Sequence, residues 1–448
     1  MRPPSTLLIY SIVFIEGFCS LGAEVIALRR LVPHVGSSIV VTAPTIGFFL
    51  LALALGYASG AKVSASYLSV VARNFLLSAA IAGVGLAGVT VDALFAQLQP
   101  ATLAYMVFIA AVLCPLAWLL GQTVPILTNL LKHARTGEAS GMALYWSTLG
   151  SFLGSISLSL VVMQWMGVSA AVFVCSLGLV VGTLMLARRS LKTVALSVLI
   201  AAVAGVLNYQ HVLTADTAYA EYRVGAVDLP DQDNSRAFWI NQSMASTIDD
   251  AQPPHYAVYI QHVRKIFLDD LGFKGKDILV LGAGGFTLSH REPLNHYTYV
   301  DIDPAIRAVA EAYFLREPAR GAFIADDARR FVATSDRRFD AMLVDVYSSH
   351  NAVPSHLVTR EFWSGTRRVL KPDGLMIANL ILDSKLESAY ARNVLATIEN
   401  VFGRCAVEVL QKGQSLANVE VSCFASSLPR ATSVYVDERN GADFDRIR

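Results

Sequence analysis

The chain has 448 residues, of which 54% are hydrophobic, and a formal net charge of +1. These averages describe two unlike halves: up to about residue 211 charges are scarce and apolar runs reach membrane-spanning length, whereas the remainder has a globular composition. The near-neutral charge says little about partners, and no Lys/Arg tract of the kind that binds nucleic acid is present.

The first half predicts about seven membrane-spanning helices. About 20 consecutive apolar residues cross the hydrocarbon core, and only a helix satisfies every backbone group there. The expected spans lie near residues 6–28, 37–60, 74–97, 101–131, 141–163, 168–187 and 193–211. Pro115 and Pro125 in the fourth span predict a kink or a partly broken helix.

Two acidic residues lie in the first span. Glu16 and Glu24 are eight residues apart, which places them within about 80° of each other around one helix. Because a polar group inside a membrane is costly, each needs a reason. Either the pair lines a polar pocket for a cation, or each acid pairs with Arg29, Arg30 or a neighbouring helix.

The second half predicts a small β-structure at residues 212–255, a main domain at residues 256–430 and a tail at residues 431–448. "YAEYRVGAVD" and "RAFWINQSMAS" each have the pattern of a strand. In the main domain, short apolar strands alternate with helical stretches near residues 304–315, 327–334, 359–370 and 383–401. The expected strands are "DILVLG", "HYTYVDID", "GAFIAD", "FDAMLVDVY" and "GLMIANLIL", followed by a closing pair, "CAVEVL" and "VEVSCFAS". This alternation is typical of a doubly wound, Rossmann-like α/β sheet.

Chemistry-bearing residues follow several of the expected strands. The Gly-rich turn at residues 282–285 follows the first strand, Asp301 ends the second about 20 residues later, and Asp326 ends the third. A ligand of such a sheet binds outside the carboxyl ends of the strands, so these residues suit a nucleoside: the glycines admit it, Asp301 accepts from ribose hydroxyls and Asp326 meets the base. Asp345 ends the fourth strand, and a carboxylate there can take a proton from an amine or stabilise a cation.

Cysteine and histidine spacing gives no indication of a metal site. All five cysteines are interpreted as buried thiols, because Cys405 and Cys423 are far apart in the sequence and the other three lie in apolar spans.

With these residues identified, the second half resembles the spermidine synthase (polyamine aminopropyltransferase) family over about residues 214–425, and the whole chain resembles its bacterial membrane-fused members. "LGAGGFTLSHRE" is similar to the family's Gly-rich loop. In the first half, "GFCSLGAEVIALRR", "LALGYASGAK", "GQTVPIL" and "YWSTLGSFLGS" are similar to the spans of the fused proteins. The resemblance implies a class I methyltransferase-type fold that takes a sulfonium nucleoside as its substrate.

The resemblance also implies roles for individual residues. Asp301 corresponds to the ribose-binding acid, Asp326 to the acid beside adenine, Asp345 to the catalytic Asp that opens a gate loop, and Tyr256 to a tyrosine that works with it. The candidate nucleoside-binding residues are Gly282, Ala283, Gly284, Gly285, Asp301, Ile302, Asp326 and Asp327. The candidate residues for the remaining substrate are Tyr347, Ser348, Glu16 and Glu24.

The chain departs from the family pattern where an amine would be held. Gly285 stands where the family's Gly-rich loop carries an Asp. The second Asp of the family's gate loop corresponds to about Ser348, and the Gln of its N-terminal strand corresponds to about Ala220. The resemblance therefore implies a retained nucleoside site with Tyr256 and Asp345, and it disfavours putrescine as acceptor.

We therefore expect a membrane-bound transferase acting on S-adenosylmethionine or its decarboxylated form, with no metal. It releases 5'-methylthioadenosine by aminopropyl transfer to an amine, or by internal cyclisation or elimination. Two alternatives remain open: a methyltransferase, and a polyamine or lipid transporter or sensor with a regulatory nucleotide domain. Expected partners are the bilayer, the nucleoside, an amine and a second copy in a homodimer.

Two arguments disagree about the side of the inner membrane on which the second half lies. With the N-terminus inside, only Arg29 and Arg30 fall outside the cytoplasm, which places the C-terminal half outside. The basic residues assigned to the cytoplasmic side are Arg2, Lys62, Arg73, Lys132, Arg135, Arg188, Arg189 and Lys192. A nucleotide supplied from the cytosol favours a cytoplasmic location. We expect the second half to lie in the cytoplasm, by a slight margin.

Overall fold

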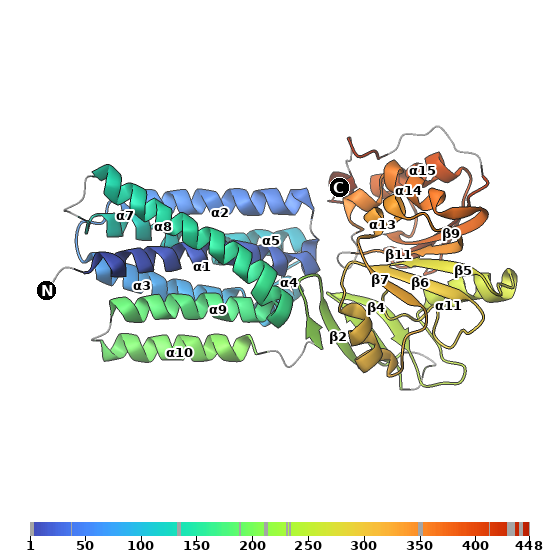
Figure 1. Cartoon of the computed structure of the whole chain (residues 1–448), viewed down its shortest axis with the longest axis horizontal. Helices are drawn as coiled ribbons and strands as arrows, with labels where there is room; N and C mark the ends of the chain where they lie inside the picture. Colours follow the sequence, from blue (N-terminus) through green and yellow to red (C-terminus); the bar gives the residue numbers. More distant parts are fainter. Residues whose placement is uncertain are drawn as a thin grey trace. The chain divides into compact units, whose positions relative to one another are not determined.

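The computed structural model describes residues 4–36, 38–131, 136–187, 190–209, 214–229, 232, 234–347, 353–411, 413–427, 435–438 and 442–447. The chain divides into two compact units (Figure 1). The helical unit comprises residues 1–37, 41–212 and 216–218, and the α/β unit comprises residues 38–40, 213–215 and 219–448.

The helical unit consists of long apolar helices that run side by side (Figure 1). Its helices are α1 (Thr6–Val35), α2 (Ile39–Gly60), α3 (Tyr67–Ala80), α4 (Gly88–Gln97), α5 (Ala101–Phe108), α6 (Cys114–Gly121), α7 (Thr123–Thr128), α8 (Thr136–Ser157), α9 (Met163–Leu186) and α10 (Leu191–Leu207). π-helical turns at Ile81–Gly85, Ile109–Leu113 and Leu158–Val162 extend or join them. Within the described residues, five stretches are long and apolar enough to cross a membrane, and α10 is a shorter apolar helix.

The expected third span, 74–97, is wrong. The long helix there is Tyr67–Gly85, and α4 is a separate helix, because Ala87 has extended backbone (φ −64°, ψ 137°). Hydropathy does not detect this break, because the residues on both sides of it are apolar. A second break, at Gly167 (φ 84°), divides the 50-residue stretch Gly137–Leu186 into two helices.

Small residues allow α1 and α8 to pack closely. A Cβ atom on Gly150 would lie 2.2 Å from the Phe14 carbonyl oxygen, and one on Gly154 would lie 2.3 Å from that of Phe18. The "LGSFLGS" segment therefore has glycine where the two backbones meet, as small-xxx-small spacing requires.

The α/β unit begins with a four-stranded sheet of order β1-β2-β3-β4. Its strands are β1 (Ala215–Asp216), β2 (Glu221–Ala226), β3 (Arg236–Ile240) and β4 (Ser243–Ile248). The expected single strand "RAFWINQSMAS" is thus a hairpin, with its turn at Asn241, whose φ is 56°. Asn adopts this left-handed conformation more readily than most residues, so Asn241 is the turn signal inside the segment that was expected to be one strand.

The main sheet has seven strands in the order β10-β11-β9-β8-β5-β6-β7. Its strands are β5 (Asp277–Leu281), β6 (His296–Asp301), β7 (Ala322–Ala325), β8 (Phe339–Val344), β9 (Leu370–Asp383), β10 (Ala406–Val409) and β11 (Leu416–Phe424). Strands β5 to β9 are mutually parallel, and β11 pairs antiparallel with both β9 and β10. This observed order confirms the predicted Rossmann-like, methyltransferase-type fold.

Helices cover both faces of this sheet. They are α11 (Val258–Arg264), α12 (Ile306–Val309) with the π-helical Ala310–Leu315, α13 (Ala328–Thr334), α14 (Arg360–Arg368), α15 (Ala389–Phe402) and the terminal α16 (Ala442–Ile447). One core packs α13, α14 and α15 against the sheet, and the other packs α11, α12 and the small sheet against the opposite face.

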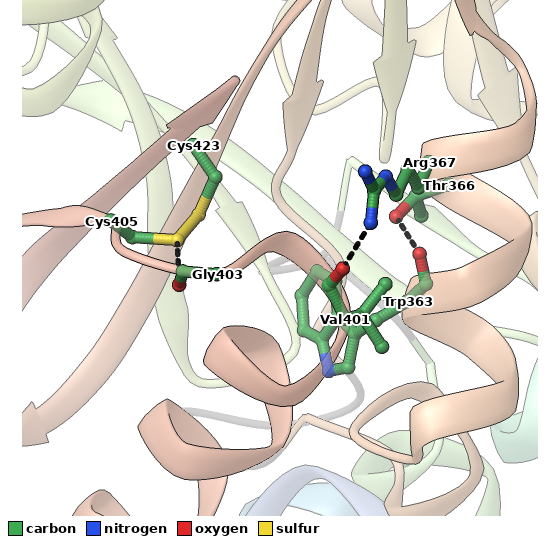
Figure 2. The surroundings of a disulfide bond; sticks show 7 residues. All are labelled: Trp363, Thr366, Arg367, Val401, Gly403, Cys405 and Cys423. Carbon is green, nitrogen blue, oxygen red and sulfur yellow. Dashed lines mark hydrogen bonds between the residues drawn. A yellow bond between two sulfur atoms is a disulfide. The ribbon is translucent and has the colours of Figure 1, made fainter. Parts of the chain in front are cut away.

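The interpretation of all five cysteines as thiols is wrong for two of them. Cys405 and Cys423 form a disulfide, with their Cα atoms 4.6 Å apart (Figure 2). Antiparallel pairing of β10 with β11 places Ala406 opposite Ser422, so the residues on either side of this pair also meet. Their separation along the sequence was therefore a poor guide to their separation in space. Cys19, Cys114 and Cys175 are free thiols.

Candidate active site

The Gly-rich turn and Asp345, which the resemblance predicts to be catalytic, meet at the carboxyl ends of β5 and β8. The amide of Asp345 donates to the carbonyl of Leu281 at 2.8 Å. Gly282 has φ 88°, and a Cβ atom there would lie 2.0 Å from the carbonyl oxygen of Asp345. Only glycine fits this crossing, which brings the predicted nucleoside loop and Asp345 side by side.

Asp301 is tied to the Gly-rich turn through the backbone. Its carboxylate accepts from the amide of Ala283 at 2.9 Å and from the amide of Asp303 at 3.0 Å. Burial raises the pKa of Asp301 to about 6, although these amide hydrogen bonds oppose the shift. A carboxylate oxygen can accept more than one hydrogen bond, so Asp301 can also accept from ribose hydroxyls.

The acids after β7 have local partners. Asp326 forms an ion pair with Arg330, Nε to Oδ1 2.5 Å, and its own amide donates to the Asp301 carbonyl at 2.9 Å. Asp327 caps α13, since its side chain accepts from the Arg330 amide at 2.9 Å. Ile302, next to Asp301, is 49% exposed, which suits an apolar contact with a base.

Gly285, which replaces an acid of the family pattern, has no room for a side chain. A Cβ atom would lie 2.4 Å from Cε1 of Phe314 and 2.8 Å from Cβ of Ser246. The amide of Gly285 donates to the Ser246 hydroxyl at 2.9 Å. Ser246 of the small sheet and Phe314 of the π-helical turn therefore occupy the space that a side chain at position 285 would need.

Asp345 is held by two side chains and is partly exposed. The hydroxyl of Tyr259 donates to Oδ2 at 2.8 Å, and the amide nitrogen of Asn379 donates to Oδ1 at 3.0 Å. Burial raises the pKa of Asp345 to about 6, and these two hydrogen bonds oppose the shift. The carboxylate is thus ionised at neutral pH, with a higher proton affinity than an ordinary Asp, as a general base requires.

The structure does not bring the hydroxyl of Tyr256 to Asp345. That hydroxyl lies 2.8 Å from Nδ1 of His290, and the guanidinium of Arg264 stacks over the ring at 4.8 Å. Tyr256 precedes α11, whereas Tyr259 lies within it, so the helix presents Tyr259 to Asp345. The resemblance implied that Tyr256 works with Asp345. The tyrosine whose hydroxyl contacts Asp345 in the structure is Tyr259, three residues further along the same segment.

Tyr347 anchors the chain just beyond Asp345. Its hydroxyl donates to the carbonyl of Asn379 and accepts from the amide of Ile381, both at 2.8 Å. Ser348, the other candidate at this position, lies outside the described residues.

The sequence analysis did not identify three side chains of this site. Asn379 on β9 contacts Asp345, Glu420 on β11 is the cross-strand partner of Asn379, and His262 on α11 contacts Glu420. Glu420 is directly opposite Asn379 in the sheet and is 1% exposed. Nδ1 of His262 lies 2.6 Å from Oε2 of Glu420. The sequence signal for Glu420 is an acid in the middle of the strand "NVEVSC", in which polar and apolar residues alternate.

Glu16 and Glu24 belong to the helical unit. Both lie on the buried side of α1, with exposures of 1% and 5%. The Ser147 hydroxyl on α8 donates to Glu16 Oε2 at 2.9 Å. This contact provides Glu16 with a structural partner on a neighbouring helix.

Comparisons with known proteins agree with this geometry. Residues 254–414 match the family described as Spermine/spermidine synthase domain. A polyamine aminopropyltransferase of Vibrio vulnificus is 32% identical over 34% of this chain and 55% of its own length, so the match spans about half of that relative. Polyamine aminopropyltransferase 1 of Streptomyces coelicolor is 27% identical over 81% of this chain and 73% of its own length.

Among solved structures, a probable spermidine synthase from Corynebacterium glutamicum matches 46% of this chain and 77% of its own, with 22% identity and a TM-score of 0.39. The matched segment, residues 254–414, includes α11, the Gly-rich turn, Asp301 and Asp345. Residues 254–414 of the α/β unit are therefore similar to a spermine/spermidine synthase domain.

Proposed function

We propose that the chain is an aminopropyltransferase-type enzyme anchored in a membrane. It binds S-adenosylmethionine or its decarboxylated form and releases 5'-methylthioadenosine. The domain match supports this assignment, and so does the Streptomyces relative, whose alignment over 81% of the chain includes residues of both units.

The observation that carries the proposal is the position of Asp345. Its carboxylate follows β8 beside the Gly-rich turn, because Gly282 and Asp345 touch through their backbones. A nucleoside held by that turn and by Asp301 would place its sulfonium close to Asp345.

The chemistry requires a base but no metal. The lone pair of an amine attacks the propyl carbon next to sulfur, the carbon–sulfur bond breaks, and its electron pair stays on sulfur, which leaves as neutral methylthioadenosine. The proton released by the amine passes to Asp345, whose oxygens are oriented by Tyr259 and Asn379.

The acceptor is proposed to differ from putrescine. Phe314 and Ser246 fill the space in which an acid at Gly285 would stand, so one anionic partner for a diamine is missing. Methylthioadenosine release is therefore expected to depend only weakly on putrescine.

Product analysis tests this proposal. The detergent-solubilised chain is incubated with each sulfonium compound, with and without a panel of amines, and products are identified by mass spectrometry. Methylthioadenosine with an aminopropylated amine supports transfer, and methylthioadenosine without such an amine supports internal cyclisation or elimination. A methylated product with S-adenosylhomocysteine, or no product from either compound, would overturn the proposal.

We further propose that the α/β unit lies outside the cytoplasm, contrary to the slight sequence preference. The end of α10 lies at the same end of the helical unit as the end of α1. Nη2 of Arg30 donates to the Ser169 hydroxyl at 2.6 Å and its Nε to the Leu86 carbonyl at 3.2 Å, while Asn208 Nδ2 donates to the Gly83 carbonyl at 2.9 Å. An odd number of crossings therefore separates Thr6 from the start of the α/β unit.

The charges at the two ends support this orientation. Arg29 donates to the carbonyls of Thr217 and Ala218 at 3.2 Å each, and Arg30 is 2% exposed, so neither acts as a free loop charge. Lys62 and Lys192 lie at the opposite end. Arg2, Lys132, Arg135, Arg188 and Arg189, which lie outside the described residues, flank that same end in the sequence.

The disulfide is the independent support. Disulfides persist in oxidising compartments and are rare in the cytosol. Because Cys405 and Cys423 belong to the α/β unit, their disulfide suits a non-cytoplasmic location. This location requires the nucleoside on that side of the membrane, since a charged sulfonium compound does not cross a bilayer unaided.

Membrane vesicles of known orientation test the location. Right-side-out vesicles should form methylthioadenosine from added sulfonium compound and should expose Glu387, on the surface of the α/β unit, when it is replaced by Cys and labelled with an impermeant maleimide. Activity and labelling confined to inside-out vesicles would refute the location while leaving the enzymatic proposal intact.

A further inference from the structure

Two buried oxygens opposite each other in the main sheet lack hydrogen-bond donors. They are Oδ1 of Asn379 and Oε1 of Glu420, whose residues are 3% and 1% exposed. Asn379 and Glu420 are direct cross-strand partners in the antiparallel pair β9–β11. Cross-strand partners have their side chains on the same face of the sheet. Two buried acceptor oxygens on one face repel each other unless a proton lies between them.

The hydrogen bonds that Asn379 and Glu420 make to other residues determine which oxygen of each side chain has no donor. Asn379 must direct its NH₂ group to the Asp345 carboxylate, because the carbonyl end would repel it, so Oδ1 points away. Glu420 uses Oε2 for His262 Nδ1, at 2.6 Å. The Tyr347 hydroxyl already donates to the Asn379 main-chain carbonyl and is not a donor for either orphaned oxygen.

We propose that Glu420 is held as a neutral carboxyl group whose proton bonds Oδ1 of Asn379, and that Glu420 thereby positions Asn379 and the catalytic Asp345. This inference rests on the proposed function of Asp345. It yields one continuous chain of hydrogen bonds: His262 to Glu420, Glu420 to Asn379, and Asn379 to Asp345. Glu420 acts through Asn379 and is a positioning residue, with no contact to substrate.

The surroundings of Glu420 favour the neutral form. Burial raises the pKa of Glu420 to about 7, against the effect of the His262 hydrogen bond, and the negative charges of Glu408 and Asp345 add to the rise. The charged and titratable groups that face Glu420 are His262 on α11, Glu408 on β10 and Asp345 after β8. The side chain of His262 is 22% exposed and that of Glu408 is 63% exposed, so the contacts of Glu420 with His262 and of His262 with Glu408 lead from the buried acid to the surface of the unit.

The arrangement gives the site a working pH range. Activity rises as Asp345 loses its proton, because only the carboxylate accepts the proton of an amine. It falls as Glu420 ionises at higher pH, because Asn379 then loses its donor and no longer holds its NH₂ group on Asp345.

Glu420→Gln distinguishes this arrangement from its alternatives. A Gln amide imitates the neutral acid: its NH₂ group donates to Asn379, and its oxygen accepts from His262. We expect this variant to keep kcat within about twofold of wild type at the optimum and to lose the alkaline fall in the pH profile. Glu420→Ala should lower kcat on the order of tenfold with little change in nucleoside KM. Glu387→Gln, an exposed acid of the same unit, is the matched control.

A readout independent of turnover separates this inference from the proposed function. Infrared difference spectra of the full chain, titrated between acidic and alkaline pH, should show the carbonyl band of a buried protonated carboxyl group that is absent in Glu420→Gln. The inference is overturned if that band is missing in wild type, or if Glu420→Gln folds normally and is as inactive as Glu420→Ala. If no sulfonium compound reacts while the band is present, the proposed function fails and the protonation of Glu420 stands.

Discussion

The two halves of the main sheet hold their acids in different ways. We name the halves by their proposed roles. In the nucleoside half, β5 to β7, Asp301 is bound by backbone amides close to it in sequence or on the adjoining turn. In the acceptor half, β8 to β11, Asp345 is bound by the side chains of Tyr259 and Asn379, which are 86 and 34 residues away.

This difference shows where local sequence suffices and where it does not. Backbone amides are present whatever the residue, so a short Gly-rich motif and one acid define the nucleoside half. Side-chain partners exist only when strand register and helix phase bring particular residues together. Under the proposed function, substitutions in the acceptor half are therefore expected to change the acceptor without disturbing the nucleoside.

The largest expected effect is on Asp345. Asp345→Asn keeps the shape but removes the base and the negative charge, so turnover should fall by about 10²-fold or more. Rates of methylthioadenosine formation are compared with those of Asp373→Asn, an exposed Asp at the other end of the sheet. Full activity of Asp345→Asn would remove the catalytic assignment.

Asp301→Ala should weaken binding of the nucleoside and leave the hydrogen bonds around Asp345 unchanged. Loss of hydrogen bonds to a charged group costs about 1.5–3 kcal/mol, so nucleoside affinity should fall by about 10- to 100-fold. Calorimetry with each sulfonium compound and with methylthioadenosine measures this change. An unchanged dissociation constant would show that the nucleoside is held elsewhere.

The disulfide should stabilise the acceptor half, where it joins β11 to the start of β10. It closes a loop with a sequence separation of 18 residues, for which the chain-entropy model gives about 3 kcal/mol. Cys405→Ser should therefore lower the Tm by about 5–10 °C. Cys114→Ser, which removes a free thiol, is the control. An equal Tm for both variants, or no effect of reductant on wild type, would contradict the prediction.

The smallest expected effect separates the two tyrosines of the α11 segment. Tyr259→Phe removes a hydrogen bond to the Asp345 carboxylate and should lower kcat by about tenfold. Tyr256→Phe removes the contact with His290 and should cost less than about threefold. The reverse order would mean that Tyr256 turns to the substrate during the reaction, as the family resemblance implies.

The sequence predicted strands β5 to β8, the Gly-rich turn after β5, and the places of Asp301 and Asp345 at strand ends, because each of these strands is a short apolar run. It did not predict the order of the strands in the sheet. It did not predict the pairing of Cys405 with Cys423, although both closing strands were expected, because no register was assigned to them. The same missing register concealed Glu420 opposite Asn379. Residues 74–97 were misassigned because hydropathy does not detect a backbone break between two apolar helices.

The packing around Gly285 has a consequence for how the site can change. Since a Cβ atom at that position would overlap Phe314 and Ser246, an acid there is compatible only with smaller or displaced neighbours. A library that varies residue 285 alone should contain no well-folded acidic variants, whereas one that varies residues 246, 285 and 314 together can. If position 285 takes part in acceptor recognition as proposed, acceptor preference depends on three positions on separate elements together, and a change at residue 285 alone does not lead to a diamine-binding site.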